Sequence, residues 1–211
     1  MEVQRKNFKV MVMGNPGVGK SELCLHARYE NPKERPTSTP TVGMDMHLLS
    51  NNNKMHPVVL TVWDCTGFLV HEEAICNRIP GTSGFILVYD TGDRKSFESL
   101  QQWVSLIKKY SNQDWIGELI GNIKDPTTRE VSIEEGVLFA KKYGLNFREM
   151  STTDRSMVKS FMSSLFDKFA IKDQPKIMNL TTPTTKSMTS SKGDIKKEKE
   201  EKEKKRDCSI F

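Results

Sequence analysis

Residues 14–21 restrict the possible folds of this chain more than any other stretch. They fit the pattern G-x-x-x-x-G-K-S, directly follow an apolar run and open a helical pattern. A strand, a glycine-rich turn and a helix N-terminus in this order form a cradle for phosphate groups, because the glycines let backbone N–H groups turn inward and the helix dipole adds positive charge. The residues of this phosphate loop are Gly14, Asn15, Pro16, Gly17, Val18, Gly19, Lys20 and Ser21.

Two side chains of the phosphate loop have predicted roles. Lys20 is expected to reach the β- and γ-phosphates of a nucleotide, and the Ser21 hydroxyl to bind Mg²⁺. Pro16 is unusual there, because proline has no N–H to donate and stiffens the loop.

The rest of the chain alternates between apolar runs and helical patterns. Strands are predicted at residues 8–13, 44–49, 58–63, 84–89, 116–121 and 146–150. Helices are predicted at residues 20–29, 97–109, 132–143 and 156–169. Ser132 and Glu135 fit a capping box, and three asparagines at 51–53 predict a hairpin turn. This order predicts the α/β class, with a six-stranded, mostly parallel sheet, helices on both faces and a site beyond the carboxyl ends of the strands.

A change of composition near residue 174 predicts the domain boundary. The chain has 211 residues, enough for one domain of ordinary size. Beyond this point Thr, Ser, Pro, Lys and Glu dominate, with little to bury. We therefore expect one domain over residues 1–173 and a flexible tail over residues 174–211.

Charge, cysteine content and the lack of long apolar runs argue against several other classes of protein. The net charge of +5 is modest, and no basic cluster is interleaved with aromatics, so a nucleic acid partner is not expected. Cys24, Cys65, Cys76 and Cys208 form no CxxC pair, which favours a reducing compartment over disulfides or zinc. The first residues lack a signal-peptide core, and no run approaches the roughly 20 apolar residues of a spanning helix.

Five further segments follow the phosphate loop in a recognisable order. They are TVGMD at 41–45, WDCTG at 63–67, VYD at 88–90 with SFE at 96–98 and Trp103, GNIKD at 121–125, and EMS at 149–151. Over about residues 7–170 they resemble the Ras-superfamily small GTPases, closest to the Rab branch, whose corresponding segments include T-I-G-V-D, W-D-T-A-G, G-N-K-x-D and E-T-S-A-K. The resemblance implies a phosphate-loop GTPase fold, GTP or GDP as the bound nucleotide, and Mg²⁺.

The resemblance also implies a metal site. Asp64 stands at a strand end and would hold Mg²⁺ together with Ser21, commonly through water. Thr41 would join the metal through its hydroxyl and the γ-phosphate through its N–H, so its loop is ordered only with triphosphate. Thr37 and Thr39 are nearby alternatives to Thr41, and an ordinary strand-end aspartate is the alternative for Asp64.

The remaining nucleotide contacts would recognise the γ-phosphate and the base. Gly67 would offer its N–H to the γ-phosphate. Asp125 would accept two hydrogen bonds from guanine, and adenine lacks that donor pair. An aspartate that merely opens a turn before Pro126 is the alternative. Asn122 would fix the loop and the base edge. The last three expected nucleotide-contacting residues are Lys124, Ser151 and Thr152.

Several positions depart from the family pattern. Phe68 stands where relatives have the glutamine that orients the attacking water, and phenylalanine has no donor or acceptor. No catalytic residue is therefore assigned, and slow hydrolysis is expected. Thr66 replaces an alanine beside the phosphates, and Ile123 replaces the lysine that packs over guanine. Thr152 and Thr153 replace Ala-Lys, a mild change because a backbone N–H survives.

Partner surfaces are expected on the loops at 36–46 and 67–80, which in the family meet effectors, exchange factors and GTPase-activating proteins. Residues 69–79 do not keep the Glu and aromatic residues of the family pattern, so familiar partner assignments do not carry over.

The chain ends in Cys208-Ser209-Ile210-Phe211, a C-a-a-X pattern whose final Phe favours geranylgeranyl on Cys208. Residues 196–206 mix Lys and Glu, which favours a solvated spacer over a basic membrane-binding patch. One lipid binds membranes only marginally, so a second contact is expected. These features predict a lipid-anchored protein on the cytoplasmic side of a cell or internal membrane.

Three functions compete on the sequence alone. The first is a GTP/GDP switch in vesicle traffic or signalling, with impaired hydrolysis. The second is a degenerate GTPase that serves as a largely GTP-locked or nucleotide-binding scaffold. The third, a phosphate-loop nucleotide kinase, predicts an Arg-rich lid, and none is visible.

Overall fold

The computed structural model describes residues 4–31, 33–37, 41, 43–51, 53, 55–68, 72–112 and 114–172. The chain divides into two units, Met1–Gln174 and Pro175–Phe211, and all described residues belong to the first. The predicted prenylation site and tail therefore lie outside the described residues, as do Thr39 and Val42. Within the described part, no helix is long and apolar enough to cross a membrane.

Six strands form one sheet in the order β2-β3-β1-β4-β5-β6. Only the β2–β3 pair is antiparallel, and the other four pairs are parallel. This architecture confirms the predicted α/β class and six-stranded sheet. The strands are β1 (Lys6–Met13), β2 (Met44–Ser50), β3 (Val58–Cys65), β4 (Gly84–Asp90), β5 (Ile116–Asn122) and β6 (Asn146–Met150).

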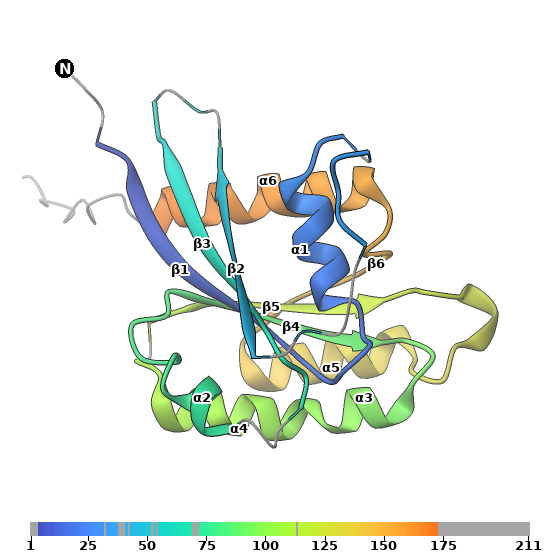
Figure 1. The fold of residues 1–211 in the computed structure, drawn as a ribbon. Helices are drawn as coiled ribbons and strands as arrows, with labels where there is room; N and C mark the ends of the chain where they lie inside the picture. The colour runs from blue at the N-terminus through green and yellow to red at the C-terminus, as the bar shows by residue number, and fades with distance from the viewer. Residues whose placement is uncertain are drawn as a thin grey trace, which may run out of the picture. The chain divides into compact units, whose positions relative to one another are not determined.

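Helices cover both faces of the sheet, with α1 and α6 on one side and α2 to α5 on the other (Figure 1). The helices are α1 (Lys20–Arg28), α2 (Glu72–Cys76), α3 (Arg94–Glu98), α4 (Leu100–Tyr110), α5 (Ile133–Tyr143) and α6 (Arg155–Lys172), with a 3₁₀ turn at Pro126–Thr128.

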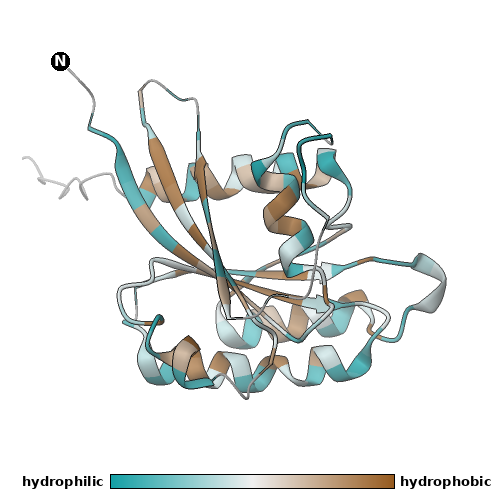
Figure 2. Cartoon of the chain, viewed as in Figure 1, coloured by the Kyte–Doolittle hydropathy of each residue, from teal (hydrophilic) through white to brown (hydrophobic). Residues whose placement is uncertain are grey.

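Alternating side chains of the central strands build a core on each face. Val10 and Val12 face α1 and α6, whereas Met11 and Met13 face the opposite helices. Strand β4 is buried along almost its whole length, as a strand covered on both faces should be. Figure 2 shows the matching pattern, with hydrophobic strands inside and hydrophilic stretches on the outer helices.

The described helices differ from the prediction in two places. Helix α2 was not predicted, because its five residues are too few to show a helical period. The single helix expected at 97–109 is two helices, since Asp93 caps α3 by accepting N–H groups of Lys95 and Ser96, and α4 starts after Ser99. The capping box of Ser132 and Glu135 at α5 is confirmed.

The parallel strands end together at one edge of the sheet. The register sets Val12 beside Asp64 and Asp90 beside Asn122. The phosphate loop after β1 therefore lies next to the ends of β3, β4 and β5, at the edge where such sheets bind ligands.

Candidate nucleotide and metal site

The phosphate loop turns between β1 and α1 on residues that tolerate unusual backbone angles. Gly19 has a φ of 105°, and a Cβ there would clash with the side-chain amide of Asn122. Lys20 is 6% exposed, and its Nζ donates to the carbonyl of Asn15 at 2.8 Å. Burial lowers the pKa of Lys20, and the nearby Asp64 opposes that shift. The ammonium is thus held inside the loop, where a phosphate would meet it.

The side chain of Asn15 ties the phosphate loop to the neighbouring helices. Its Nδ2 donates to Ser99 Oγ at 3.0 Å, and its Oδ1 accepts from the indole Nε1 of Trp103 at 3.1 Å. Both the amide nitrogen and the amide oxygen of Asn15 therefore help to anchor the phosphate loop.

Three oxygen-bearing side chains from separate segments meet beside the loop. Ser21 Oγ donates to Asp64 Oδ2 at 2.5 Å and lies 3.0 Å from Thr41 Oγ1. The Thr41 hydroxyl donates to the same Asp64 oxygen at 3.2 Å. The three residues expected to hold Mg²⁺ are thus brought together, and Thr37, the described alternative, is exposed.

Asp64 is the most confined member of this cluster. It is 1% exposed, and its Oδ1 has no hydrogen-bond partner within the described part of the protein. Burial raises the pKa of this carboxyl, while the hydrogen bond from Ser21 and the charge of Lys20 lower it. A buried carboxylate oxygen without a donor is costly unless a cation reaches it.

The side chains of Ser21, Thr41 and Asp64 suit Mg²⁺ that is shared with a nucleotide phosphate better than a metal ion coordinated by protein side chains alone. Among the described residues, no three His, Cys, Asp or Glu side chains gather as a metal site. One carboxylate and two hydroxyls suit a hard cation that keeps several waters and shares oxygens with a substrate phosphate. Bound there, Mg²⁺ would neutralise charge on the β- and γ-phosphates.

The segment after β3 packs against the phosphate loop. A Cβ at Gly67 would clash with the backbone of Asn15 and Pro16, so only glycine allows this approach. The next residue, Phe68, is 51% exposed, and its N–H donates to Thr66 Oγ1 at 3.4 Å. The exposed ring at position 68 offers no polar group to a water molecule.

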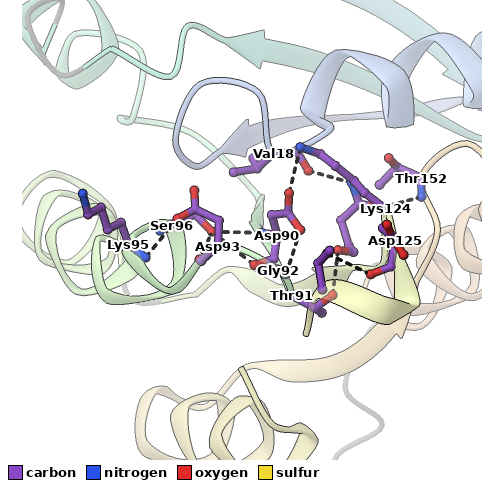
Figure 3. Close-up of polar contacts among 12 residues, drawn as sticks. Val18, Asp90, Thr91, Gly92, Asp93, Lys95, Ser96, Lys124, Asp125 and Thr152 are labelled. Atoms are coloured by element: carbon purple, nitrogen blue, oxygen red, sulfur yellow. Dashed lines mark hydrogen bonds and ion pairs between the residues drawn. The ribbon is translucent and has the colours of Figure 1, made fainter. Parts of the chain in front are cut away.

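At the end of β5, Asn122 links the phosphate loop to the loop after β6. The residue is 2% exposed, its Nδ2 donates to the carbonyl of Val18 at 2.8 Å, and its Oδ1 accepts from the N–H of Thr152 at 3.0 Å. Both partners, Val18 and Thr152, are labelled in Figure 3. Thr152 therefore uses its backbone donor within the protein, while Ser151 Oγ lies 2.9 Å from Thr153 Oγ1. Asn122 thus links the phosphate loop to the loop after β6, and its predicted contact with the base edge stays a prediction.

Asp125 lies at the start of the 3₁₀ turn. Its Oδ1 accepts from the N–H of Thr127 at 2.8 Å and from its hydroxyl at 2.7 Å. These hydrogen bonds lower the pKa of Asp125, so the exposed carboxylate is an ionised acceptor at neutral pH. The turn-opening role and an acceptor role toward guanine are compatible, because Thr127 bonds to one carboxylate oxygen.

Two ion pairs near the loops that follow β5 and β6 were not predicted from the sequence. Lys124 Nζ lies 2.7 Å from Asp90 Oδ2, and Arg129 binds both carboxylate oxygens of Glu149 at 2.7 Å. The second pair joins the loop after β5 to the end of β6. No local sequence signal identifies either pair, because the partners lie far apart in the chain.

Comparison with known proteins agrees with this geometry. The sequence profile of the Ras family matches residues 9–170. The chain is 31% identical to the Ras-related protein SEC4 of Saccharomyces cerevisiae over 158 residues, which cover 75% of this chain and 73% of SEC4. It is 31% identical to the Ras-related protein RABD2a of Arabidopsis thaliana over 180 residues, covering 84% and 88% of the two chains. It is 32% identical to the Ras-related protein Rab-18 of Caenorhabditis briggsae over 162 residues, covering 76% and 79%. The chain therefore belongs to the Ras family and is a Rab-like small GTPase.

Proposed function

We propose that this protein is a membrane-anchored switch that alternates between GTP and GDP in vesicle traffic or signalling, with slow intrinsic hydrolysis. The observation that carries the proposal is the meeting of Ser21, Thr41 and Asp64 beside the buried Lys20. These residues would hold Mg²⁺ and the phosphates. Thr41 comes from the loop between α1 and β2, so loss of the γ-phosphate would release that loop and change the surface offered to partners.

Guanine selectivity would come from Asp125. The carboxylate is ionised, exposed and fixed by Thr127. Guanine presents a pair of N–H donors to such a carboxylate, whereas adenine would leave it unpaired. Asn122 supports this site by holding the phosphate loop and the loop after β6 together.

Slow hydrolysis would follow from Phe68. Turnover needs a water molecule held in line with the γ-phosphorus, and relatives use a glutamine amide for this. The half-exposed Phe68 ring cannot donate or accept a hydrogen bond. Loss of one polar group that acts in the transition state typically costs about 10²–10³ in rate.

The membrane part of the proposal depends on the tail. Residues 1–173 would form the nucleotide-binding domain, and residues 174–211 would link it to a geranylgeranyl group on Cys208. One prenyl chain gives only marginal binding, so a partner bound to the loops at 36–46 and 67–80 would supply the second contact. Within these loops Met46 and Phe68 are about half exposed, at 49% and 51%.

A second function is favoured by the same Phe68 observation. If hydrolysis is negligible, the protein would serve as a largely GTP-locked scaffold and would not cycle. The two functions share the binding site and differ in turnover, so a single-turnover hydrolysis assay separates them.

The direct test of the binding site is the Mg²⁺ dependence of nucleotide release. We expect chelation of Mg²⁺ to accelerate dissociation of fluorescent GDP from the wild-type protein, and Ser21→Ala to remove most of that effect. Ser105→Ala is a matched control, because its exposed hydroxyl donates to the carbonyl of Gln101 within α4. Equal release with and without Mg²⁺, or equal affinity for adenine nucleotides, would contradict the proposal.

A further inference from the structure

Four lysines gather where two neighbouring helices end. They lie in the last turns of α4 and α5, all four are exposed, and they are Lys108, Lys109, Lys141 and Lys142. The ammonium groups of Lys108 and Lys142, one from each helix, lie 4.8 Å and 5.1 Å from the ring centroid of Tyr143. The two helix ends therefore form one basic surface, which we call the lysine patch.

The positive charge of the lysine patch is not neutralised within the domain. In the part of the chain that the structure describes, none of its four members forms an ion pair with a carboxylate. The contact with Tyr110 raises the pKa of Lys109 most, and the charge of Glu72 adds to it from beyond ion-pair distance. The helix dipoles favour a lysine at each carboxyl end. Two ammonium groups over one ring still repel each other, so an external anionic surface would lower the energy of the patch.

Apolar and aromatic side chains accompany these charges. Leu138 lies one turn before Lys141 and Lys142 in α5 and is 65% exposed. Tyr110 and Tyr143 end α4 and α5 and are half-buried. An anionic lipid surface suits this combination, because lysines meet the headgroups while leucine and tyrosine enter the boundary with the acyl chains. A nucleic acid backbone would match the charges and leave Leu138 in water.

The lysine patch lies at the edge of the sheet opposite the phosphate loop. Helices that connect parallel strands run back along the sheet, so α4 and α5 end at the edge where the strands begin. Helix α6 ends at the same edge, because Lys172 Nζ donates to the carbonyl of Asp114, between α4 and β5, at 2.6 Å. Figure 1 shows α4 and α6 ending on the side of the sheet where β1 begins.

This position agrees with the proposed lipid anchor. The chain continues from Lys172 into residues 174–211, which include Cys208. The tail therefore starts at the edge that carries the lysine patch. Insertion of a lipid on Cys208 would hold the domain near the bilayer and raise the effective concentration of the patch at its surface. The nucleotide site, at the opposite edge, would then face away from the membrane.

We propose that the lysine patch binds the anionic lipid headgroups of the membrane into which the lipid on Cys208 inserts. The inference rests on the membrane anchoring in the proposed function and adds a contact made by the folded domain itself. It supplements the single lipid, whose binding alone is marginal, and it is separate from the contact with a protein partner.

Binding of the full chain, with geranylgeranyl on Cys208, to vesicles tests the inference. The vesicles contain phosphatidylcholine alone or an equal mixture with phosphatidylserine. The neutralised variant combines Lys108→Gln with Lys142→Gln, and the charge-retaining variant has Arg at both positions. The control variant combines Lys95→Gln with Lys159→Gln, because these exposed lysines lie near the starts of α3 and α6, at the nucleotide edge. Thermal unfolding and release of fluorescent GDP are measured on the same samples.

The neutralised variant should bind the mixed vesicles about 30-fold more weakly than wild type, from about fivefold for each lysine near an anionic surface. The charge-retaining and control variants should bind like wild type, because distant charges are screened. Added salt should weaken wild-type binding to the mixed vesicles, and all variants should bind the neutral vesicles equally. Melting temperatures and GDP release should stay close to wild type throughout.

Several outcomes would overturn the lysine patch and leave the proposed function standing. One is equal binding of wild type and the neutralised variant to the mixed vesicles, and another is an equal loss in the control variant. A neutralised variant that leaves cell membranes but binds both vesicles normally would identify an acidic protein, not lipid, as the occupant. A full chain whose Cys208 accepts no lipid, or that binds neither vesicle, would overturn the proposed anchoring together with this inference.

Discussion

Replacement of Asn122 by alanine should damage both stability and nucleotide binding. The wild-type side chain is 2% exposed and makes two hydrogen bonds to backbone groups, at 2.8 Å to Val18 and 3.0 Å to Thr152. Asn122→Ala leaves a buried carbonyl and a buried N–H without partners, each at about 1–3 kcal/mol. The loss should total about 2–6 kcal/mol, a large share of the roughly 5–15 kcal/mol that stabilises a typical domain.

The assay is urea unfolding of the nucleotide-free protein, followed by the release rate of fluorescent GDP. Asn51→Ala is the matched control, since Asn51 also makes two backbone hydrogen bonds, to His56 and Val58, but in the β2–β3 turn. Water can replace those bonds, so the control should lose less than about 1 kcal/mol and release GDP normally. Equal losses in the two variants would refute the view that Asn122 is a buried bridge between the base loops and the phosphate loop.

Three further substitutions test separate parts of the proposal. Phe68→Gln should raise single-turnover GTP hydrolysis from a wild-type rate below that of Ras, roughly 3–5 × 10⁻⁴ s⁻¹, and a wild-type rate at or above that value would rule out the role given to Phe68. Asp125→Asn should weaken GTP and relatively favour xanthine nucleotide, whose base presents an acceptor to the new amide; unchanged GTP affinity would remove Asp125 from the site. Cys208→Ser should leave the domain folded but move the protein from membranes to the soluble fraction, and identical partition of both proteins would exclude prenylation at that thiol.

The central strands could be predicted because β3 and β4 are short, nearly continuous apolar runs with clear ends. All six predicted ranges fall within the strands of the structure, which extend them by one or two residues at most. Strand β4, predicted at 84–89, ends one residue later at Asp90, a polar residue that hydropathy alone excludes. The sequence therefore predicts the core of each strand better than its polar end, where the site residues lie.

The helices on the α2–α5 face were harder to predict. Asp93 caps α3 through its side chain, a start signal that precedes the apolar pattern used to predict a helix at 97–109. The five residues of α2 lie where the family pattern is weakest. In both places the local hydrophobic period is too short to define a helix, and contacts with the sheet decide the outcome.

Site residues could be predicted where a short sequence motif lies next to a predicted strand. The phosphate loop directly follows β1, and Asp64 lies at the carboxyl end of β3, so their place at this edge of the sheet follows from the fold class. The Lys124–Asp90 pair could not be predicted, because it joins the ends of two strands through residues 34 positions apart in the printed sequence. Sequence position gives no information about such a pair until the strand order is known.

The nucleotide content of the purified protein tests the central claim most directly. Protein purified in Mg²⁺ should be denatured, and the released nucleotide separated by ion-pair chromatography and compared with the molar amount of protein. A guanine-nucleotide site with slow turnover predicts close to one guanine nucleotide per chain, with GTP in excess over GDP. A predominance of GDP would contradict slow hydrolysis, and the absence of guanine nucleotide, or an adenine nucleotide in its place, would contradict the proposed function itself.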